Sequence, residues 1–203
     1  MMSVEGMTIM SKQITRDDIM DMAEYANVRA DKRKALVAIK RDRRLPVGPH
    51  ATFYFESYET MWQQVHEMLF IERGGEEQIP DELEAYNPLI PQGRELVATL
   101  MFEIDNPTVR KSVLAKLGGV EETCFMRIGD DEIVATAEED VDRTTADGKA
   151  SSVQFLHFAF SDAQVAAFTA PDANVTLGIK HPAYAHMTVL SEAARAALAK
   201  DFN

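Results

Sequence analysis

Cysteine is almost absent from this chain of 203 residues, which contains one such residue, Cys124. A single cysteine cannot form a disulfide within the chain, so the composition does not point to an oxidising compartment. Long hydrophobic runs are absent too, because no stretch approaches the about 18 apolar residues that a membrane-spanning helix needs. Glu5 falls where a secretory signal would be basic and then apolar. We therefore expect a cytoplasmic protein that does not associate with a membrane.

The motifs of common catalytic and cofactor sites are also missing. The sequence has no Gly-rich phosphate loop followed by lysine, no dinucleotide fingerprint and no serine nucleophile elbow. A structural zinc site would need a cluster of cysteine and histidine. The nearest approach to a di-iron motif is Gln63-x-x-His66, in which glutamine replaces the carboxylate ligand. These absences predict a protein with no cofactor and no resident metal.

Negative charge dominates, with 33 acidic against 21 basic side chains and a net charge of −12. A surface of this sign repels polyanions, so nucleic acid is not the expected partner. One segment differs, because residues 32–44 contain seven basic side chains. Such a run is most often a solvated helix face. The alternative is a weak contact site for an anion or an acidic partner, made by Arg41, Arg43 and Arg44.

The apolar periodicity predicts an α+β fold with a mostly antiparallel sheet of five or six strands, packed helices and a helical N-terminal part. We interpret residues 1–203 as a single domain in which 1–14 are disordered and 15–45 are helical. A charged loop is expected over 138–150, and Cys124 is expected to be buried and inert. The predicted helices are about 16–25, 30–43, 57–73, 81–86 and 107–117, then a short one after Ser161 and a last one over 191–201. The predicted strands are about 52–56, 95–104, 122–128, 132–137, 153–160 and 175–179.

Two short segments are stiffened by proline and carry polar side chains, as binding loops on rigid scaffolds often do. They span residues 85–91 and 181–186. If both lie near the acidic end of the helix over 57–73, then carboxylate, imidazole and phenol groups surround one small cavity. The alternative is that each segment merely closes the sheet. The candidate pocket residues are Glu67, Glu72, Tyr86, Asn87, His181 and Tyr184.

A distinctive run, Ala-Tyr-Asn-Pro-Leu-Ile-Pro, occupies residues 85–91. Together with other stretches it resembles an uncharacterised bacterial family, the domain-of-unknown-function family numbered three-five-zero-one. The resemblance spans nearly the whole chain, although Gln154 and His157 stand where the family often has histidine and arginine. Family members tend to be encoded beside rubrerythrin-like and iron–sulfur oxidoreductase genes, which implies a role near peroxide defence or electron transfer. The other matching stretches are 47–49, 53–56, 67–69 with Glu72, 151–158 and 181–184.

Two functions from different classes follow from these observations. The leading hypothesis is an accessory or partner-binding protein of a redox or oxidative-stress pathway, with a protein partner from that pathway and no cofactor of its own. The alternative is a small enzyme or metal-binding protein that uses the carboxylate/His/Tyr pocket. A third, weaker hypothesis is an anion or nucleic-acid contact through residues 32–44. Elemental analysis with an absorption spectrum would separate the first two.

Overall fold

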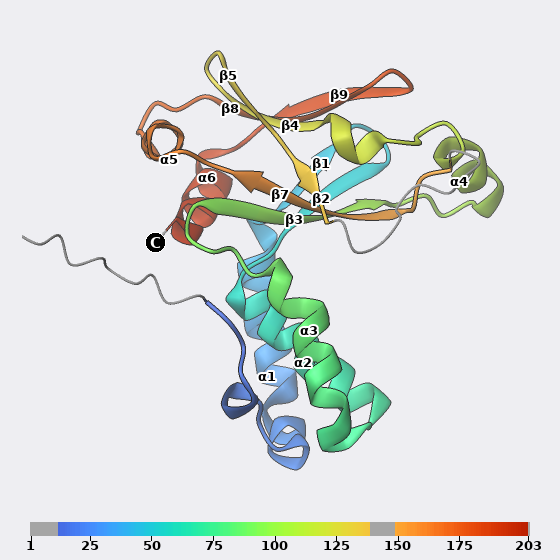
Figure 1. Cartoon of the computed structure of the whole chain (residues 1–203), viewed down its shortest axis with the longest axis vertical. Coiled ribbons are helices and arrows are strands. Elements are labelled where there is room, and N and C mark those ends of the chain that lie inside the picture. Colours follow the sequence, from blue (N-terminus) through green and yellow to red (C-terminus); the bar gives the residue numbers. More distant parts are fainter. Residues whose placement is uncertain (1–11, 139–148, 203) are drawn as a thin grey trace, which may run out of the picture.

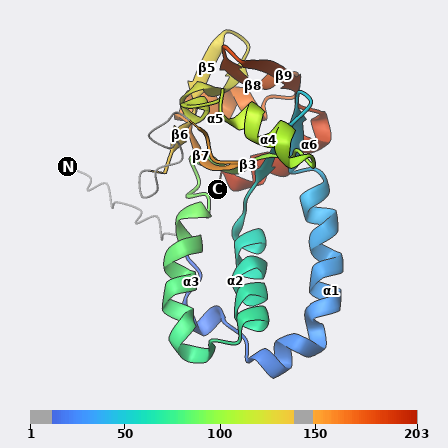
Figure 2. The same ribbon diagram turned by 90° about the vertical axis from the view of Figure 1, so that its right-hand side faces the viewer.

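The computed structural model describes residues 12–138 and 149–202. Within these ranges the chain forms two β-sheets and a helical arm that projects from them (Figure 1). The first three helices make up the arm and run alongside one another (Figure 2). The helices are α1 (Met22–Arg41), α2 (Tyr58–Glu72), α3 (Ile79–Tyr86), α4 (Pro107–Leu114), α5 (Asp162–Thr169) and α6 (Glu192–Leu198).

The strands in the described ranges form two antiparallel sheets. These strands are β1 (Arg44–Val47), β2 (Ala51–Phe55), β3 (Glu95–Phe102), β4 (Cys124–Ile128), β5 (Asp131–Val134), β6 (Thr136–Ala137), β7 (Val153–Ala159), β8 (Val175–His181) and β9 (Tyr184–Val189). The five-stranded sheet has the order β1-β2-β3-β7-β6, and the four-stranded sheet has the order β5-β4-β8-β9. The predicted α+β class with a helical N-terminal part is confirmed, and its strands are divided between two sheets instead of forming one.

The alternation of side chains along β3 determines what each face of the five-stranded sheet contacts. Leu96, Ala98 and Leu100 are fully buried in the main apolar core, which lies between the two sheets. Val97 and Thr99 point to the opposite face, where the arm is attached. Successive side chains of a strand point to opposite faces, so the predicted strand over 95–104 is confirmed with an end two residues earlier.

A second, smaller apolar cluster holds the arm to the outer face of the five-stranded sheet. Val65 and Leu69 of α2 pack there with Ile90 and Val97. The buried apolar face of α2 agrees with the periodicity that predicts a helix over 57–73. The arm is therefore attached by its own core and does not share the main core.

The segment before the arm is part of this second cluster. Ile14 is 2% exposed, its backbone N–H donates to Asn87 Oδ1 at 2.8 Å, and Asn87 Nδ2 donates to the Ile14 carbonyl at 3.0 Å. The expectation that residues 1–14 are disordered is therefore wrong for residues 12–14. Residues 1–11, and most of the loop expected over 138–150, lie outside the described residues.

One continuous helix, α1, replaces the two helices predicted over 16–25 and 30–43. Asp21 caps its N-terminus by accepting the backbone N–H of Ala23 at 2.8 Å. No glycine or proline interrupts the next 20 residues, so nothing in the sequence ends the helix where the prediction placed a break.

Strands β1 and β9 were not among the predicted strands, and the first residues of β1 fall in the segment 15–45 that was expected to be helical. Pro46 lies in β1, which is an edge strand, where a missing N–H donor is tolerated. Pro182 lies in the turn between β8 and β9, so residues 181–186 form a hairpin of the four-stranded sheet.

Candidate functional site

Three cavities adjoin where the arm meets the five-stranded sheet. We call the first the α1–α2 groove, a hollow of about 670 Å³ between those two helices. The second, the sheet-face cavity, has about 300 Å³ and lies between α2, α3 and the outer face of the sheet. The third, the junction cavity, has about 580 Å³ and reaches the C-terminal segment. Lys40 and Gln64 line the first two cavities, and Arg43 lines the last two.

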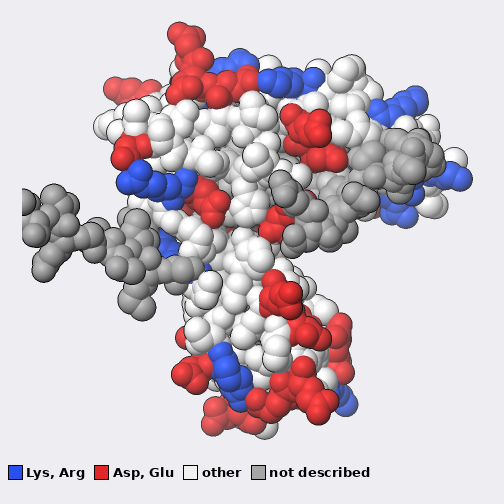
Figure 3. Space-filling model, viewed as in Figure 1, with Lys and Arg blue, Asp and Glu red and all other residues white. Residues whose placement is uncertain are grey.

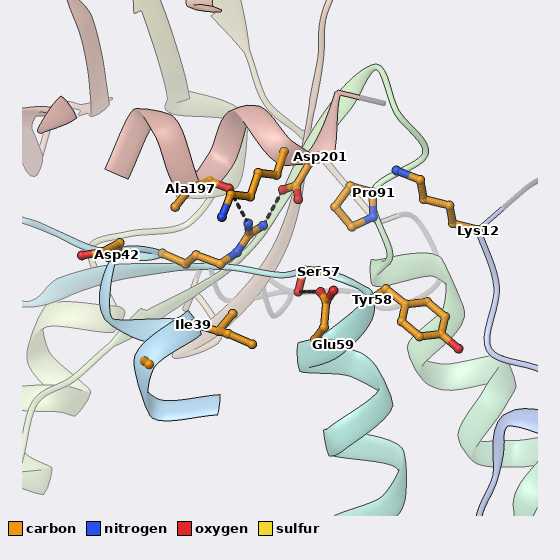
Figure 4. Close-up of a pocket in the computed structure, with 12 residues that line it drawn as sticks. Lys12, Ile39, Asp42, Ser57, Tyr58, Glu59, Pro91, Ala197 and Asp201 are labelled. Carbon is orange, nitrogen blue, oxygen red and sulfur yellow. Dashed lines mark hydrogen bonds and ion pairs between the residues drawn. The ribbon is translucent and has the colours of Figure 1, made fainter. Parts of the chain in front are cut away.

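Arg43 connects the junction cavity to the C-terminal segment. Its side chain donates to the carbonyl oxygens of Phe55 at 3.0 Å, Glu56 at 2.5 Å and Ala197 at 3.0 Å, and it forms an ion pair with Asp201. Ala197 and Asp201 face this cavity in Figure 4. Burial raises the pKa of Asp201, and the bond to Arg43 opposes that rise. Because Arg43 is 5% exposed, the prediction that it contacts an external anion is corrected.

The α1–α2 groove combines positive charge with exposed apolar side chains. Val37 of α1 is 69% exposed and Ile71 of α2 is 62% exposed. Acidic side chains gather instead at the far end of the arm, away from the sheets (Figure 3). The groove is therefore a basic and apolar site on an acidic protein. The basic residues that line it are Arg33, Lys40, Arg41 and Arg44.

Arg41 and Arg44, two of the three residues predicted to contact an anion, are exposed at this groove. The Arg41 guanidinium pairs with the neighbouring Asp42 at 2.9 Å, an exposed pair of small energetic value. The Arg44 guanidinium lies 4.6 Å from the centroid of the Tyr54 ring. Arg44 is thus held in one orientation by stacking, with its charge facing solvent.

Glu67 holds α1 and α2 together along the same groove. It accepts a hydrogen bond from the Tyr25 hydroxyl at 2.7 Å and two from Arg29, at 2.9 Å and 2.7 Å. The Arg29 bonds lower the pKa of Glu67, and burial raises the pKa of Tyr25 well above its ordinary value. These hydrogen bonds, which we call the Glu67 clamp, keep the Glu67 carboxylate ionised and use its oxygens as acceptors. Glu67 therefore has a structural role, which is to join α1 to α2.

The sheet-face cavity is lined by one carboxylate, Glu56, by the cationic side chains of Lys40 and Arg43, and by apolar and aromatic side chains. Glu56 is 8% exposed and accepts hydroxyl hydrogen bonds from Thr99 at 2.7 Å and Thr60 at 2.6 Å. Met61 and Phe155 form part of the apolar wall. Glu56 was not among the predicted site residues. The only local signal for it is its place just before the Ser–Thr capping box that starts α2.

The six residues predicted to surround one pocket lie in separate parts of the molecule. Tyr86 lines the sheet-face cavity, and Glu67 lines the α1–α2 groove. Glu72 is exposed and accepts a bond from Gln78 at 2.8 Å. Asn87 is engaged by the backbone of the N-terminal segment, as described above. These four belong to the arm but do not share a cavity.

His181 and Tyr184 lie on the four-stranded sheet, in the β8–β9 hairpin. The Tyr184 hydroxyl donates to the Val47 carbonyl at 2.7 Å and accepts the backbone N–H groups of His50 and Ala51, each at 2.9 Å. The His181 ring lies 3.3 Å from a backbone carbonyl of the turn before β4. Tyr184 therefore fastens the β1–β2 turn to the second sheet. The predicted convergence of 85–91 with 181–186 is wrong, because the second segment belongs to the sheet that does not carry the arm.

The thiol and the ligating side chains outside the three cavities were also located. Cys124 is fully buried, as predicted, and burial raises the pKa of its thiol well above the ordinary value. Among residues 12–138 and 149–202, no group of three or more His, Cys, Asp or Glu side chains is placed to hold a metal ion.

In the same ranges, no helix combines the length and the apolar character that crossing a membrane requires.

Comparisons with known proteins agree with the resemblance noted in the sequence. Residues 13–202 match the sequence model of a family described as "Protein of unknown function (DUF3501)". A crystal structure of a novel protein of unknown function from Burkholderia pseudomallei is similar, with 36% sequence identity and a TM-score of 0.87. The match covers 95% of this chain and 100% of that one. No curated protein matches the chain.

Proposed function

The chain belongs to the DUF3501 family of proteins of unknown function, and we propose that it is an accessory protein whose α1–α2 groove binds an acidic partner protein. One observation carries the proposal: two exposed apolar side chains, Val37 and Ile71, lie among four basic ones on a chain with a net charge of −12. The complementary surface carries carboxylates around at least one apolar side chain.

The physical chemistry of the groove suits association better than catalysis. Covering Val37 and Ile71 contributes about 25 cal/mol per Å² of apolar area removed from water. The basic side chains guide the approach of an acidic surface and select against basic ones. Stacking of Arg44 on Tyr54 and the Glu67 clamp hold the groove in one shape, which lowers the entropy lost on binding.

We further propose that the partner belongs to a redox or oxidative-stress pathway. This part rests on the family resemblance, which associates such chains with rubrerythrin-like and iron–sulfur oxidoreductase genes. In this role the protein needs no cofactor, because its partner supplies the redox chemistry. We do not propose the alternative enzyme or metal-binding function, since the six residues on which it depended are dispersed.

Isothermal titration calorimetry with the rubrerythrin-like and iron–sulfur oxidoreductase proteins of the same genome tests the proposal. We expect one of them to bind, and Lys40→Glu combined with Arg44→Glu to weaken binding by at least about tenfold, or about 1.4 kcal/mol. Binding should also weaken as salt is added. The matched control is Lys111→Glu with Lys116→Glu on exposed positions of the chain around α4, which changes net charge equally.

Two results would overturn this function. The first is that neither protein binds at low salt. The second is that the Lys40 and Arg44 double variant binds as tightly as the unmodified protein while the Lys111 and Lys116 control loses affinity. That result would indicate that the partner binds beside the β-sheets, around α4, and not at the α1–α2 groove.

A further inference from the structure

Strand β9 is an edge strand of the four-stranded sheet, on the side of the molecule away from the arm (Figure 1). Its pairing with β8 begins at the tight turn between His181 and Tyr184. At the other end, the Leu190 N–H donates to the Val175 carbonyl at 2.9 Å, which continues the same series of pairs. Hydrogen-bonded and non-hydrogen-bonded pairs alternate along an antiparallel ladder. Every second residue of β9 therefore bonds to β8, and the residues between them direct their backbone groups outward.

The outward-directed residues are Ala185, Met187 and Val189. No backbone hydrogen bond formed within residues 12–138 and 149–202 uses their outward N–H and C=O groups. Their side chains are exposed as well, since Met187 is 62% exposed and Val189 is 65% exposed. A row of free backbone groups beside apolar side chains is a template for the pairing of another strand.

The sequence of β9 lacks the features that usually protect an edge strand. Lysine, proline, charged side chains, bulges and very short strands serve this purpose in other proteins. Strand β9 has no lysine, proline or acidic residue, and it pairs with β8 without a bulge. The other edge strands of the two sheets do have such features, because β1 contains Arg44 and Pro46, β5 contains Asp131 and Glu132, and β6 has two residues. Among the described strands, β9 is therefore the edge that is open to pairing.

The charge around β9 favours a second copy of this chain as the occupant. Two copies with a net charge of −12 repel each other unless the surfaces that meet lack acidic groups. Residues 173–191, which include β8 and β9, contain no Asp or Glu, although the whole chain has 33. Lys180 of β8 forms an ion pair with Glu132 of β5, so its charge is compensated within the sheet. Two copies of the β9 edge can thus approach without facing like charges.

We propose that β9 pairs with β9 of a second copy in an antiparallel, two-fold symmetric contact. Met187 then lies opposite Met187 of the other copy, and Ala185 lies opposite Val189. Residues matched in this way exchange a pair of backbone hydrogen bonds, so the two four-stranded sheets join into one continuous sheet. A two-fold contact is self-complementary and is the commonest arrangement in soluble homo-oligomers. This surface is separate from the α1–α2 groove, and the inference does not depend on the proposed function.

The outer face of the four-stranded sheet suits the same register. Val134, Phe125, Gly178 and Met187 lie in one row across its strands. The Phe125 ring fills the space above Gly178, where a Cβ atom would lie 2.5 Å from the ring. Pairing at Met187 extends this apolar row into the second copy and covers part of the exposed Met187 side chain, because side chains directly opposite each other on one face are in contact.

Sedimentation velocity of the full chain over about a hundredfold range of concentration tests the proposal. We expect a reversible equilibrium between monomer and dimer. Met187→Lys places like charges opposite each other and should weaken association by at least about tenfold. Val109→Lys makes the same change of charge at an exposed position of α4 and should leave association unaltered. Lys40→Glu with Arg44→Glu, in the α1–α2 groove, should also leave it unaltered.

A mixture of two variants tests the register of the contact. Met187→Lys and Met187→Glu should each be monomeric alone, and mixing equal amounts should restore the dimer, since opposite charges then face each other. A variant that merely fails to fold cannot be rescued in this way. Should Met187→Lys fail to fold, Val189→Lys replaces it at the other exposed apolar position of β9.

Several results would overturn the proposal. The first is a chain that stays monomeric at every concentration, and the second is a Met187→Lys variant that associates as tightly as the unmodified protein. A mixture of the Lys and Glu variants that stays monomeric would place Met187 outside the two-fold contact. Dissociation of the Lys40 and Arg44 double variant, with Met187→Lys still dimeric, would place the contact between copies on the arm.

Discussion

The β-sheets and the helical arm are stabilised in different ways. Between the sheets, strands from distant parts of the chain bury a large continuous apolar core. In the arm, Tyr25 is the one residue of the 20-residue helix α1 that is buried. An isolated helix of this length is marginal in water, so α1 depends on a few specific polar contacts. The sheets therefore provide most of the stability, and the arm provides exposed surface.

This difference is a physical reason for placing the proposed binding surface on the arm. Regions with few buried apolar contacts open most easily, and binding surfaces are drawn from them. The α1–α2 groove and the sheet-face cavity both lie there. The following predictions test how far the two regions differ, from the largest expected effect to the smallest.

The link between the two regions is expected to matter most for stability. Arg43→Ala leaves Asp201 buried without its cation and removes the donor to three carbonyl groups. We expect a loss of about 3–5 kcal/mol in the free energy of unfolding, measured by urea denaturation. The exposed neighbour serves as control, because Arg41→Ala should cost no more than about 0.5 kcal/mol. Similar losses in both variants would refute the structural role of Arg43.

The clamp within the arm should have a smaller and more local effect. Tyr25→Phe removes the hydroxyl that donates to Glu67 while Arg29 remains in place. We expect a loss of about 0.5–1.5 kcal/mol in unfolding free energy, with faster amide exchange in α1. Tyr86→Phe is the matched control, since the Tyr86 hydroxyl accepts one long bond of 3.4 Å from Gln64. An unchanged exchange rate in α1 would show that the clamp does not hold the helix.

A histidine in each region should give pH effects of opposite sign. In the arm, burial lowers the pKa of His66, whose Nδ1 donates to the Trp62 carbonyl at 2.7 Å and whose Nε2 accepts the Met20 N–H at 3.1 Å. Its contribution to stability is present above the unfolded pKa and is lost as pH falls through the folded pKa. Acid should therefore release the arm first, which near-UV circular dichroism of Trp62 would detect. Loss of the Trp62 signal only together with the sheets would contradict this order.

On the five-stranded sheet the sign is reversed. Hydrogen bonds to Glu95 at 3.1 Å and to Glu138 at 3.3 Å raise the pKa of His157. Its contribution is complete below the unfolded pKa and disappears as pH rises through the folded pKa. The stability difference between the unmodified protein and His157→Gln should shrink between weakly acidic and weakly basic pH. A difference that grows over this interval would mean that His157 is neutral in the folded protein.

The sequence predicted best those elements that depend on local periodicity. The apolar face of α2 and the alternation along β3 follow from spacing alone, and both elements end within two residues of the prediction. Strands β1 and β9 were not predicted, because Pro46 within β1 and Pro182 in the turn before β9 are residues typical of loops. In each case the pairing with a distant strand outweighed the local signal.

The cavities found in the structure could not be predicted from the sequence, because they depend on contacts between segments that are remote in the chain. Placing His181 near Asn87 assumed one sheet, whereas two sheets separate the hairpin from the arm. Glu56 has an ordinary place at the end of a strand in sequence terms. Its burial arises only when α2 and α3 cover the outer face of the sheet.

Hydrogen–deuterium exchange of the protein alone and with the acidic protein that binds it in the calorimetric titration tests the central claim most directly. The account predicts that peptides from residues 33–44 and 63–71, which line the α1–α2 groove, become protected on binding. Peptides from β8 and β9 should exchange at the same rate in both samples. Protection confined to β8 and β9, with α1 unchanged, would contradict the assignment of binding to the arm.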